Sequence, residues 1–192
     1  MNNKVVYRIF QAFVRNKFSV LRFNFRGVGK STGCFDHGVG ELIDAATAMD
    51  WLEGNCPEAS SCWIAGFSFG AWIALQLLMR RPEASRFVIA APPVQYDLTF
   101  LSPCPTPGLI IQGTDDTVVS EDKVYKFYEK LEKQRSDLEY QVIDKADHFF
   151  TNKLDEFDEL LDNYLQANGS IEDQPRRMKK DRRKRQHGAV DE

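Results

Sequence analysis

The chain has 192 residues, of which 43% are hydrophobic and 28% charged, values typical of one globular domain with a sizeable core. Its formal net charge at pH 7 is -3, but residues 170–192 hold eight Lys/Arg against five Asp/Glu, which leaves 17 basic against 23 acidic residues in 1–169. An acidic body argues against a general nucleic-acid surface, so no nucleic-acid partner is expected.

The cysteine and histidine content argues against a metal site. The four cysteines have no C-x-x-C spacing, and three histidines are too few for a metal-ligand cluster. No metal and no cofactor are therefore predicted, and unpaired cysteines favour a reducing cytoplasm. No apolar run approaches the length of about 18 residues that a membrane span needs, and no secretion signal is expected from the N-terminal residues.

Hydrophobic periodicity predicts helices and strands in alternation. Helices are expected at 5–16, 41–51, 69–79, 121–133 and 152–167, and strands at 18–25, 63–67, 87–91, 108–112 and 139–143. This alternation predicts an α/β fold, an open parallel sheet with helices on both faces. Beyond Gly169 the apolar periodicity ends, so we expect a domain at 1–169 followed by a basic, disordered tail at 170–192.

The loop after the first predicted strand, 27–33, is rich in glycine and contains Gly29-Lys30-Ser31. A phosphate-binding P-loop ends in the same Gly-Lys-Ser sequence, but it needs another glycine five positions before Gly29. This chain has Asn24 at that position. The pattern is incomplete, and nucleotide binding is disfavoured.

The apolar run 63–67 leads into Gly66-Phe67-Ser68-Phe69-Gly70, a Gly-x-Ser-x-Gly pattern between a predicted strand and a predicted helix. Such a corner strains the serine backbone and exposes its hydroxyl, and both glycines are expected to make room where a side chain would collide. The N–H groups of Phe69 and Gly70 would lie at a helix N-terminus, ready to receive negative charge. Ser68 is therefore the candidate nucleophile.

A serine nucleophile needs a base and an acid that orients the base. Of the three histidines, His148 follows the last predicted strand, at the sheet edge where ligand-facing loops gather, while His37 remains the alternative. For the acid, the loop after strand 108–112 offers two neighbours, Asp115 and Asp116. We prefer Asp116 because its Gly-x-x-Asp-x-x-Val frame fits the pattern of the family described next, and we keep Asp115 open.

Together these motifs resemble the small bacterial α/β-hydrolases related to dienelactone hydrolase. The resemblance extends over about residues 1–165 and rests on Arg22–Ser31, Gly66–Gly70, Ala91–Pro93, Gly113–Asp116 and Ala146–Phe150. It implies an α/β-hydrolase fold with a catalytic triad in the chain order Ser68, Asp116, His148, and an oxyanion donor at the Phe69 N–H.

The resemblance also implies a departure at the N-terminus. Family members have about three strands before the helix that opens this chain, and the loop leading into that helix supplies a second oxyanion donor. We therefore expect an N-terminally truncated sheet with a gap between strand 18–25 and the strand that precedes Ser68. A single oxyanion donor would make the enzyme weak.

The leading hypothesis is a serine hydrolase that cleaves a carboxylic ester or thioester of a small acyl substrate, and an amide or small peptide would use the same residues. Phe67, Phe69, Trp72 and Phe149 suggest an apolar wall beside the site, although Trp72 could equally be core. The alternative is a non-catalytic binding protein whose basic tail makes the contact.

Overall fold

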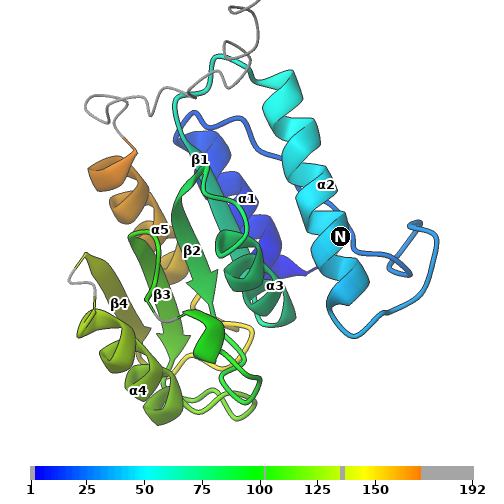
Figure 1. Ribbon diagram of the computed structural model, residues 1–192. Coiled ribbons are helices and arrows are strands. Elements are labelled where there is room, and N and C mark those ends of the chain that lie inside the picture. Colours follow the sequence, from blue (N-terminus) through cyan, green and yellow to red (C-terminus); the bar gives the residue numbers. More distant parts are fainter. Residues whose placement is uncertain (1–2, 102, 135–136, 170–192) are drawn as a thin grey trace, which may run out of the picture.

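The computed structural model describes residues 3–101, 103–134 and 137–169 (Figure 1). In chain order its elements are α1 (Lys4–Arg15), α2 (Val39–Asn55), β1 (Cys62–Phe67), α3 (Phe69–Leu78), β2 (Ala84–Ala90), the 3-10 turn η1 (Thr99–Leu101), β3 (Gly108–Gly113), α4 (Glu121–Glu132), β4 (Leu138–Ile143) and α5 (Leu154–Asn168). The tail expected at 170–192 lies outside the described residues. Within them, no helix is both long and apolar enough to cross a membrane.

The four strands form one parallel sheet in the order β1-β2-β3-β4. Each crossover between neighbouring strands carries the chain back to the start of the sheet, through a helix in two of the three cases. All carboxyl ends therefore lie at one edge, at the bottom of Figure 1. The predicted α/β fold with an open parallel sheet is confirmed.

Helices cover both faces of the sheet, and each face has its own core. Along β2 the side chains alternate, so that Phe87 and Ile89 join the cluster under α2, α3 and α4, while Val88 and Ala90 join the cluster under α1 and α5. Because every residue of β3 is buried, this strand forms the centre of the molecule.

The prediction of a strand at residues 18–25 is wrong. The segment packs against β1 and the start of α3, since the Phe18 ring lies 5.2 Å from the Trp63 ring of β1 and the Phe25 ring lies 5.7 Å from the Phe69 ring of α3. No backbone hydrogen bond joins this segment to β1, and no strand lies between them within the described chain. A short run of apolar residues indicates that a segment is buried. A strand also needs a neighbouring strand that pairs with its N–H and C=O groups.

The start of α2 is held by a buried carboxylate. Glu41 is only 1% exposed, and its two carboxylate oxygens accept the backbone N–H groups of Asp36, at 2.9 Å, and Gly38, at 2.8 Å. Nearby, the guanidinium and backbone N–H of Arg26 both donate to the Asp44 carboxylate. These contacts fasten the loop after segment 18–25 to the helix.

Replacing Glu41 with glutamine is expected to make folding less dependent on pH. Burial alone would raise the pKa of Glu41, but the N–H groups of Asp36 and Gly38 outweigh it and hold the pKa below its ordinary value. The ionised carboxylate therefore stabilises the fold above its unfolded pKa of about 4.3, and this contribution is lost as pH falls through the lower folded pKa.

Urea unfolding between pH 3 and pH 7 measures the effect. At pH 7 the Glu41→Gln variant should lose about 1 to 3 kcal/mol of unfolding free energy, and its difference from the wild type should shrink as the pH falls. Glu58→Gln, in an exposed loop, is the matched control. If the plots of unfolding free energy against pH were parallel for the wild type and Glu41→Gln, Glu41 would have no part in the pH dependence.

Candidate active site

Ser68 occupies a sharp corner between β1 and α3. Its backbone angles are φ 50° and ψ -120°, a conformation that residues other than glycine rarely adopt. The corner is fixed by a 3.0 Å hydrogen bond from the Ser68 N–H to the Ala90 carbonyl of β2. A Cβ at Gly66 would lie 2.4 Å from the Gly70 carbonyl oxygen, so the close return of α3 onto β1 requires glycine there.

The expected steric role of Gly70 is wrong. A Cβ built at this position meets no atom within 4 Å, and its backbone does not adopt a positive φ. Of the two glycines in the motif, only Gly66 is needed to avoid a collision. The motif places Gly70 in the first turn of α3, where the side of the helix beside it is open.

The structure brings together three side chains from loops at the carboxyl edge of the sheet. His148 Nε2 lies 3.0 Å from Ser68 Oγ, and His148 Nδ1 lies 2.8 Å from Asp116 Oδ2. His148 is 7% exposed and Asp116 6%. Because the Asp116 carboxylate accepts hydrogen bonds, it favours the tautomer with the proton on Nδ1, which leaves Nε2 as an acceptor facing the serine hydroxyl.

Asp116 is held in place by three further donors. Its Oδ1 accepts the backbone N–H groups of Val118 and Val119, both at 2.8 Å, and its Oδ2 accepts Gln112 Nε2 at 3.0 Å. Sequence reasoning missed Gln112, which is fully buried at the end of β3. The available signal was a lone amide side chain in an otherwise apolar strand, directly before the Gly113–Asp116 loop.

A glycine brings the aspartate and histidine loops into contact. A Cβ at Gly113 would lie 2.3 Å from the Ala146 carbonyl oxygen. The same carbonyl accepts the Asp115 N–H at 3.0 Å, and Thr114 Oγ1 accepts the Lys145 N–H at 2.7 Å. The loops after β3 and β4 are therefore tied together, which fixes the separation of Asp116 from His148.

The competing residues lie outside this arrangement. Asp115 is exposed and accepts the Thr114 hydroxyl. Asp147 accepts the N–H groups of Phe149 and Thr151, so it braces the turn that carries His148. The hydrogen bond from Thr151, partly opposed by burial, lowers the pKa of Asp147. His37 is exposed in the loop before α2, with its ring 4.9 Å from that of Phe35.

A free helix N-terminus and two aromatic rings lie beside Ser68 and His148. Phe69 is the first residue of α3, so its N–H has no acceptor within the helix and lies at the positive end of the helix dipole. The Phe67 ring packs 5.1 Å from the His148 ring, and Phe149 beside it is 53% exposed. The serine therefore has a backbone N–H without a helical acceptor on one neighbour and apolar rings close to its histidine partner.

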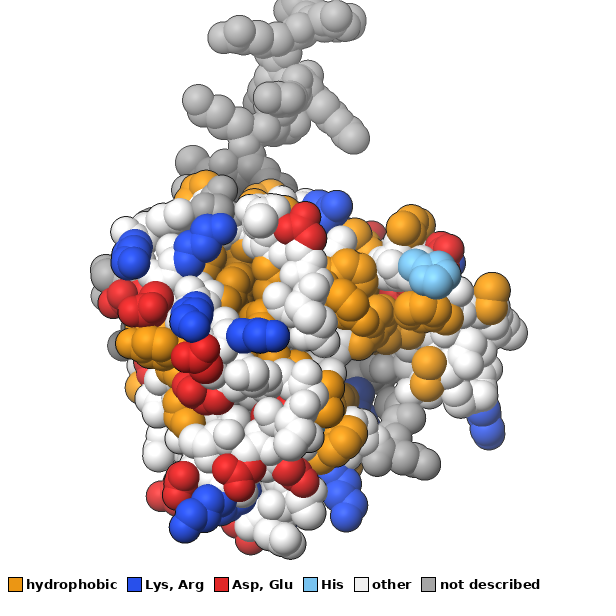
Figure 2. All heavy atoms as spheres, turned by 90° about the horizontal axis from the view of Figure 1, so that it is seen from below, with side chains coloured by type: hydrophobic (Ala, Val, Ile, Leu, Met, Phe, Trp, Pro, Cys, Tyr) orange, Lys and Arg blue, Asp and Glu red, His pale blue; other side chains and the backbone are white. Residues whose placement is uncertain are grey.

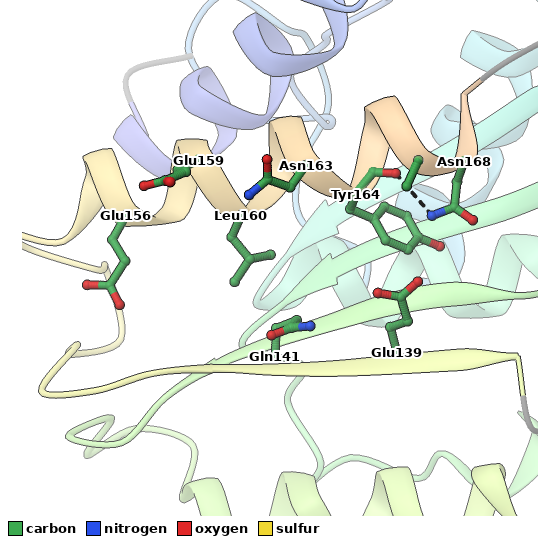
Figure 3. Close-up of a pocket in the computed structure, with 9 residues that line it drawn as sticks. Glu139, Gln141, Glu156, Glu159, Leu160, Asn163, Tyr164 and Asn168 are labelled. Carbon is green, nitrogen blue, oxygen red and sulfur yellow. Dashed lines mark hydrogen bonds between the residues drawn. The ribbon is translucent and has the colours of Figure 1, made fainter.

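A pocket of about 580 Å³ adjoins the histidine loop. Its lining combines Phe149, Thr151 and Asn152 with polar residues of the first turns of α1, among them Lys4 and Arg8. A second pocket, of about 350 Å³, lies between β4 and α5 and contains none of the three clustered side chains (Figure 3). Across the described parts of the chain, no cluster of three or more His, Cys, Asp or Glu residues could hold a metal ion.

The comparison with protein families gives the family of this chain. The sequence profile of the dienelactone hydrolase family matches residues 35–179. The chain belongs to this family. The chain is also similar to the uncharacterized protein RP471 of Rickettsia prowazekii, to which it is 52% identical over 171 residues, or 86% of this chain and 72% of that protein.

Solved structures show the same fold as this dienelactone hydrolase family member. ATU1826 of Agrobacterium tumefaciens, a protein of unknown function assigned to the alpha/beta hydrolases, is 47% identical with a TM-score of 0.83, over 91% of this chain and 82% of its own. A serine hydrolase homologue from Coxiella burnetii is 38% identical with a TM-score of 0.80, over 86% and 77%. The α/β-hydrolase resemblance predicted from the motifs is confirmed.

Proposed function

We propose that this protein is a serine hydrolase that cleaves carboxylic esters or thioesters, with Ser68 as nucleophile, His148 as base and Asp116 as the group that orients the base. The observation that carries the proposal is the continuous hydrogen-bond chain from Ser68 Oγ through the His148 ring to Asp116 Oδ2. A serine hydroxyl gains nucleophilicity only when such a base removes its proton, and this pairing supplies one.

In the first half of the reaction Ser68 Oγ attacks the substrate carbonyl carbon while His148 Nε2 takes the hydroxyl proton. The carbonyl oxygen becomes an oxyanion that the Phe69 N–H stabilises at the start of α3. His148 then gives its proton to the departing alcohol or thiol as the bond to the carbonyl carbon breaks. The acyl group remains as an ester on Ser68, and Asp116 stabilises the imidazolium formed in between.

In the second half a water molecule attacks the acyl-serine carbonyl carbon. His148 Nε2 removes a proton from this water and returns it to Ser68 Oγ as the acyl bond breaks, so that the carboxylic acid leaves and the serine is restored. The buried Asp116 carboxylate keeps the ring in one tautomer throughout, because it is itself held by Gln112, Val118 and Val119.

Labelling with a fluorophosphonate tests the proposal. The full chain is expected to form a covalent adduct at Ser68, located by peptide mass spectrometry, because only an activated serine attacks the phosphorus centre at a useful rate. Heat-unfolded protein is the control for non-specific reaction. An adduct spread over several serines, or none at Ser68, would contradict the assignment of the nucleophile.

A further inference from the structure

A continuous aromatic surface extends from the residue after the nucleophile. It consists of Phe35, Phe69, Trp72 and Tyr96. The Phe69 ring lies 5.7 Å from Phe35 and 5.8 Å from Trp72, and Trp72 lies 5.0 Å from Tyr96. These separations are those of rings in direct contact.

The outer members of this aromatic surface are exposed. Phe35 is 58% exposed and Tyr96 46%, and neither belongs to the two buried clusters, whereas Phe69 and Trp72 pack partly against the core. Figure 2 shows the face at the carboxyl ends of the strands, where hydrophobic side chains gather around an exposed histidine. Single exposed rings are ordinary, but four contiguous rings form the kind of patch that marks a binding site.

Separate segments of the chain pack together to form this aromatic surface. Gly38, at φ 96°, precedes α2, and a Cβ there would lie 2.3 Å from the Trp72 ring, so the start of α2 closes directly onto Trp72. Phe35 and Tyr96 come from two separate loops, after residue 25 and after β2. Three separate parts of the chain therefore contribute to one apolar surface that starts beside Ser68.

A second space for substrate lies beside the histidine loop and has a mixed lining. The pocket of about 580 Å³ next to Phe149 is lined by charged residues such as Lys4 and Arg8 and by apolar ones such as Val5 and Leu154. None of the four rings of the aromatic surface lines this pocket, so the two are separate places where a substrate arm could lie. The two arms of an ester extend in opposite directions from its carbonyl carbon.

We propose that the substrates of this hydrolase are esters with one bulky apolar arm, aromatic or long aliphatic, that lies on the surface formed by Phe35, Phe69, Trp72 and Tyr96. This inference rests on the proposed function, because it takes Ser68 as the attacking group. A flat ring or alkyl chain would gain by leaving water for this surface, and stacking on the exposed rings would add to the gain.

Three unactivated esters test whether the alcohol arm or the acyl arm of the substrate binds the aromatic surface. Ethyl acetate is small on both sides, benzyl acetate enlarges the alcohol arm, and ethyl phenylacetate enlarges the acyl arm. Hydrolysis is followed by acid release at constant pH. For the wild type, kcat/KM for at least one enlarged ester should exceed that for ethyl acetate by about tenfold or more.

The variants Phe35→Ala and Tyr96→Ala should each lower the ratio of kcat/KM for the enlarged ester to kcat/KM for ethyl acetate by about three- to tenfold. Both side chains are exposed, so the fold should survive, and circular dichroism checks it. Trp51→Ala is the matched control, since Trp51 is also 58% exposed but lies near the far end of α2; its ratio should equal that of the wild type.

The outcomes separate this inference from the proposed function. A wild-type ratio near one, or a ratio that neither aromatic variant changes, would overturn the inference while leaving the serine hydrolase intact. Hydrolysis that persists in Ser68→Ala, or no hydrolysis of any ester by the wild type, would instead overturn the proposed function and with it the inference.

Discussion

Replacing Ser68 or His148 with alanine is expected to abolish ester hydrolysis, with each variant lowering kcat by about 10⁴- to 10⁶-fold. The hydroxyl and the ring act as one unit across their 3.0 Å contact, because the serine attacks only as the ring takes its proton. The double variant should therefore be no slower than either single variant. Turnover of a short activated ester and circular dichroism of each variant provide the measurements.

His37→Ala is the control for the choice of histidine. Because His37 lies in the exposed loop before α2, where its ring contacts that of Phe35, its variant should stay within about threefold of wild-type kcat. A tenfold further loss in the double variant over either single variant would show that Ser68 and His148 act independently, against the proposed mechanism.

Asp116→Asn is expected to lower kcat by about 10⁴-fold with little change in structure. The new amide oxygen can still accept the N–H groups of Val118 and Val119. The new amide nitrogen would face His148 Nδ1 and donate to it, which moves the ring proton to Nε2 and removes the acceptor for the serine proton. Gln112 Nε2 would lose Asp116 Oδ2 as an acceptor, but it keeps the Val119 carbonyl at 2.9 Å, so it is not left without a partner.

Asp115→Asn is the matched control for the neighbouring residue. Its carboxylate is exposed and bonded to the Thr114 hydroxyl, so its variant should keep nearly full activity. Both variants are measured for kcat and for melting temperature. Reversed effects would assign the orienting role to Asp115, and a loss of melting temperature in Asp116→Asn as large as its loss of activity would point to a structural role alone.

Much of the site could be predicted because its chemistry is local in sequence. The Ser68 corner follows from the Gly-x-Ser-x-Gly pattern between strand and helix, and the aspartate and histidine each follow a strand directly. The choice of Asp116 over Asp115 rested on the family's Gly-x-x-Asp-x-x-Val pattern, and the structure gives the physical difference: of the two, only the Asp116 carboxylate reaches the histidine ring.

The features that sequence reasoning missed depend on contacts between distant segments. Segment 18–25 has the composition of a strand, but its ladder partner cannot be read from its own residues. Gln112 donates to Asp116, which lies in the loop after β3, so its role depends on how that loop folds. Phe35 and Tyr96 belong to different loops, so their shared surface with Phe69 and Trp72 exists only after folding.

The unpaired side of β1 has a consequence for motion. In the described sheet β1 pairs only with β2 and β4 only with β3, whereas β3, which carries the Asp116 loop, is paired on both sides. Local opening of a fold takes least free energy where the fewest contacts hold the backbone. Ser68 and His148 follow edge strands and Asp116 follows an interior one, so amide hydrogen exchange is expected to be slower in β3 than in β1 or β4.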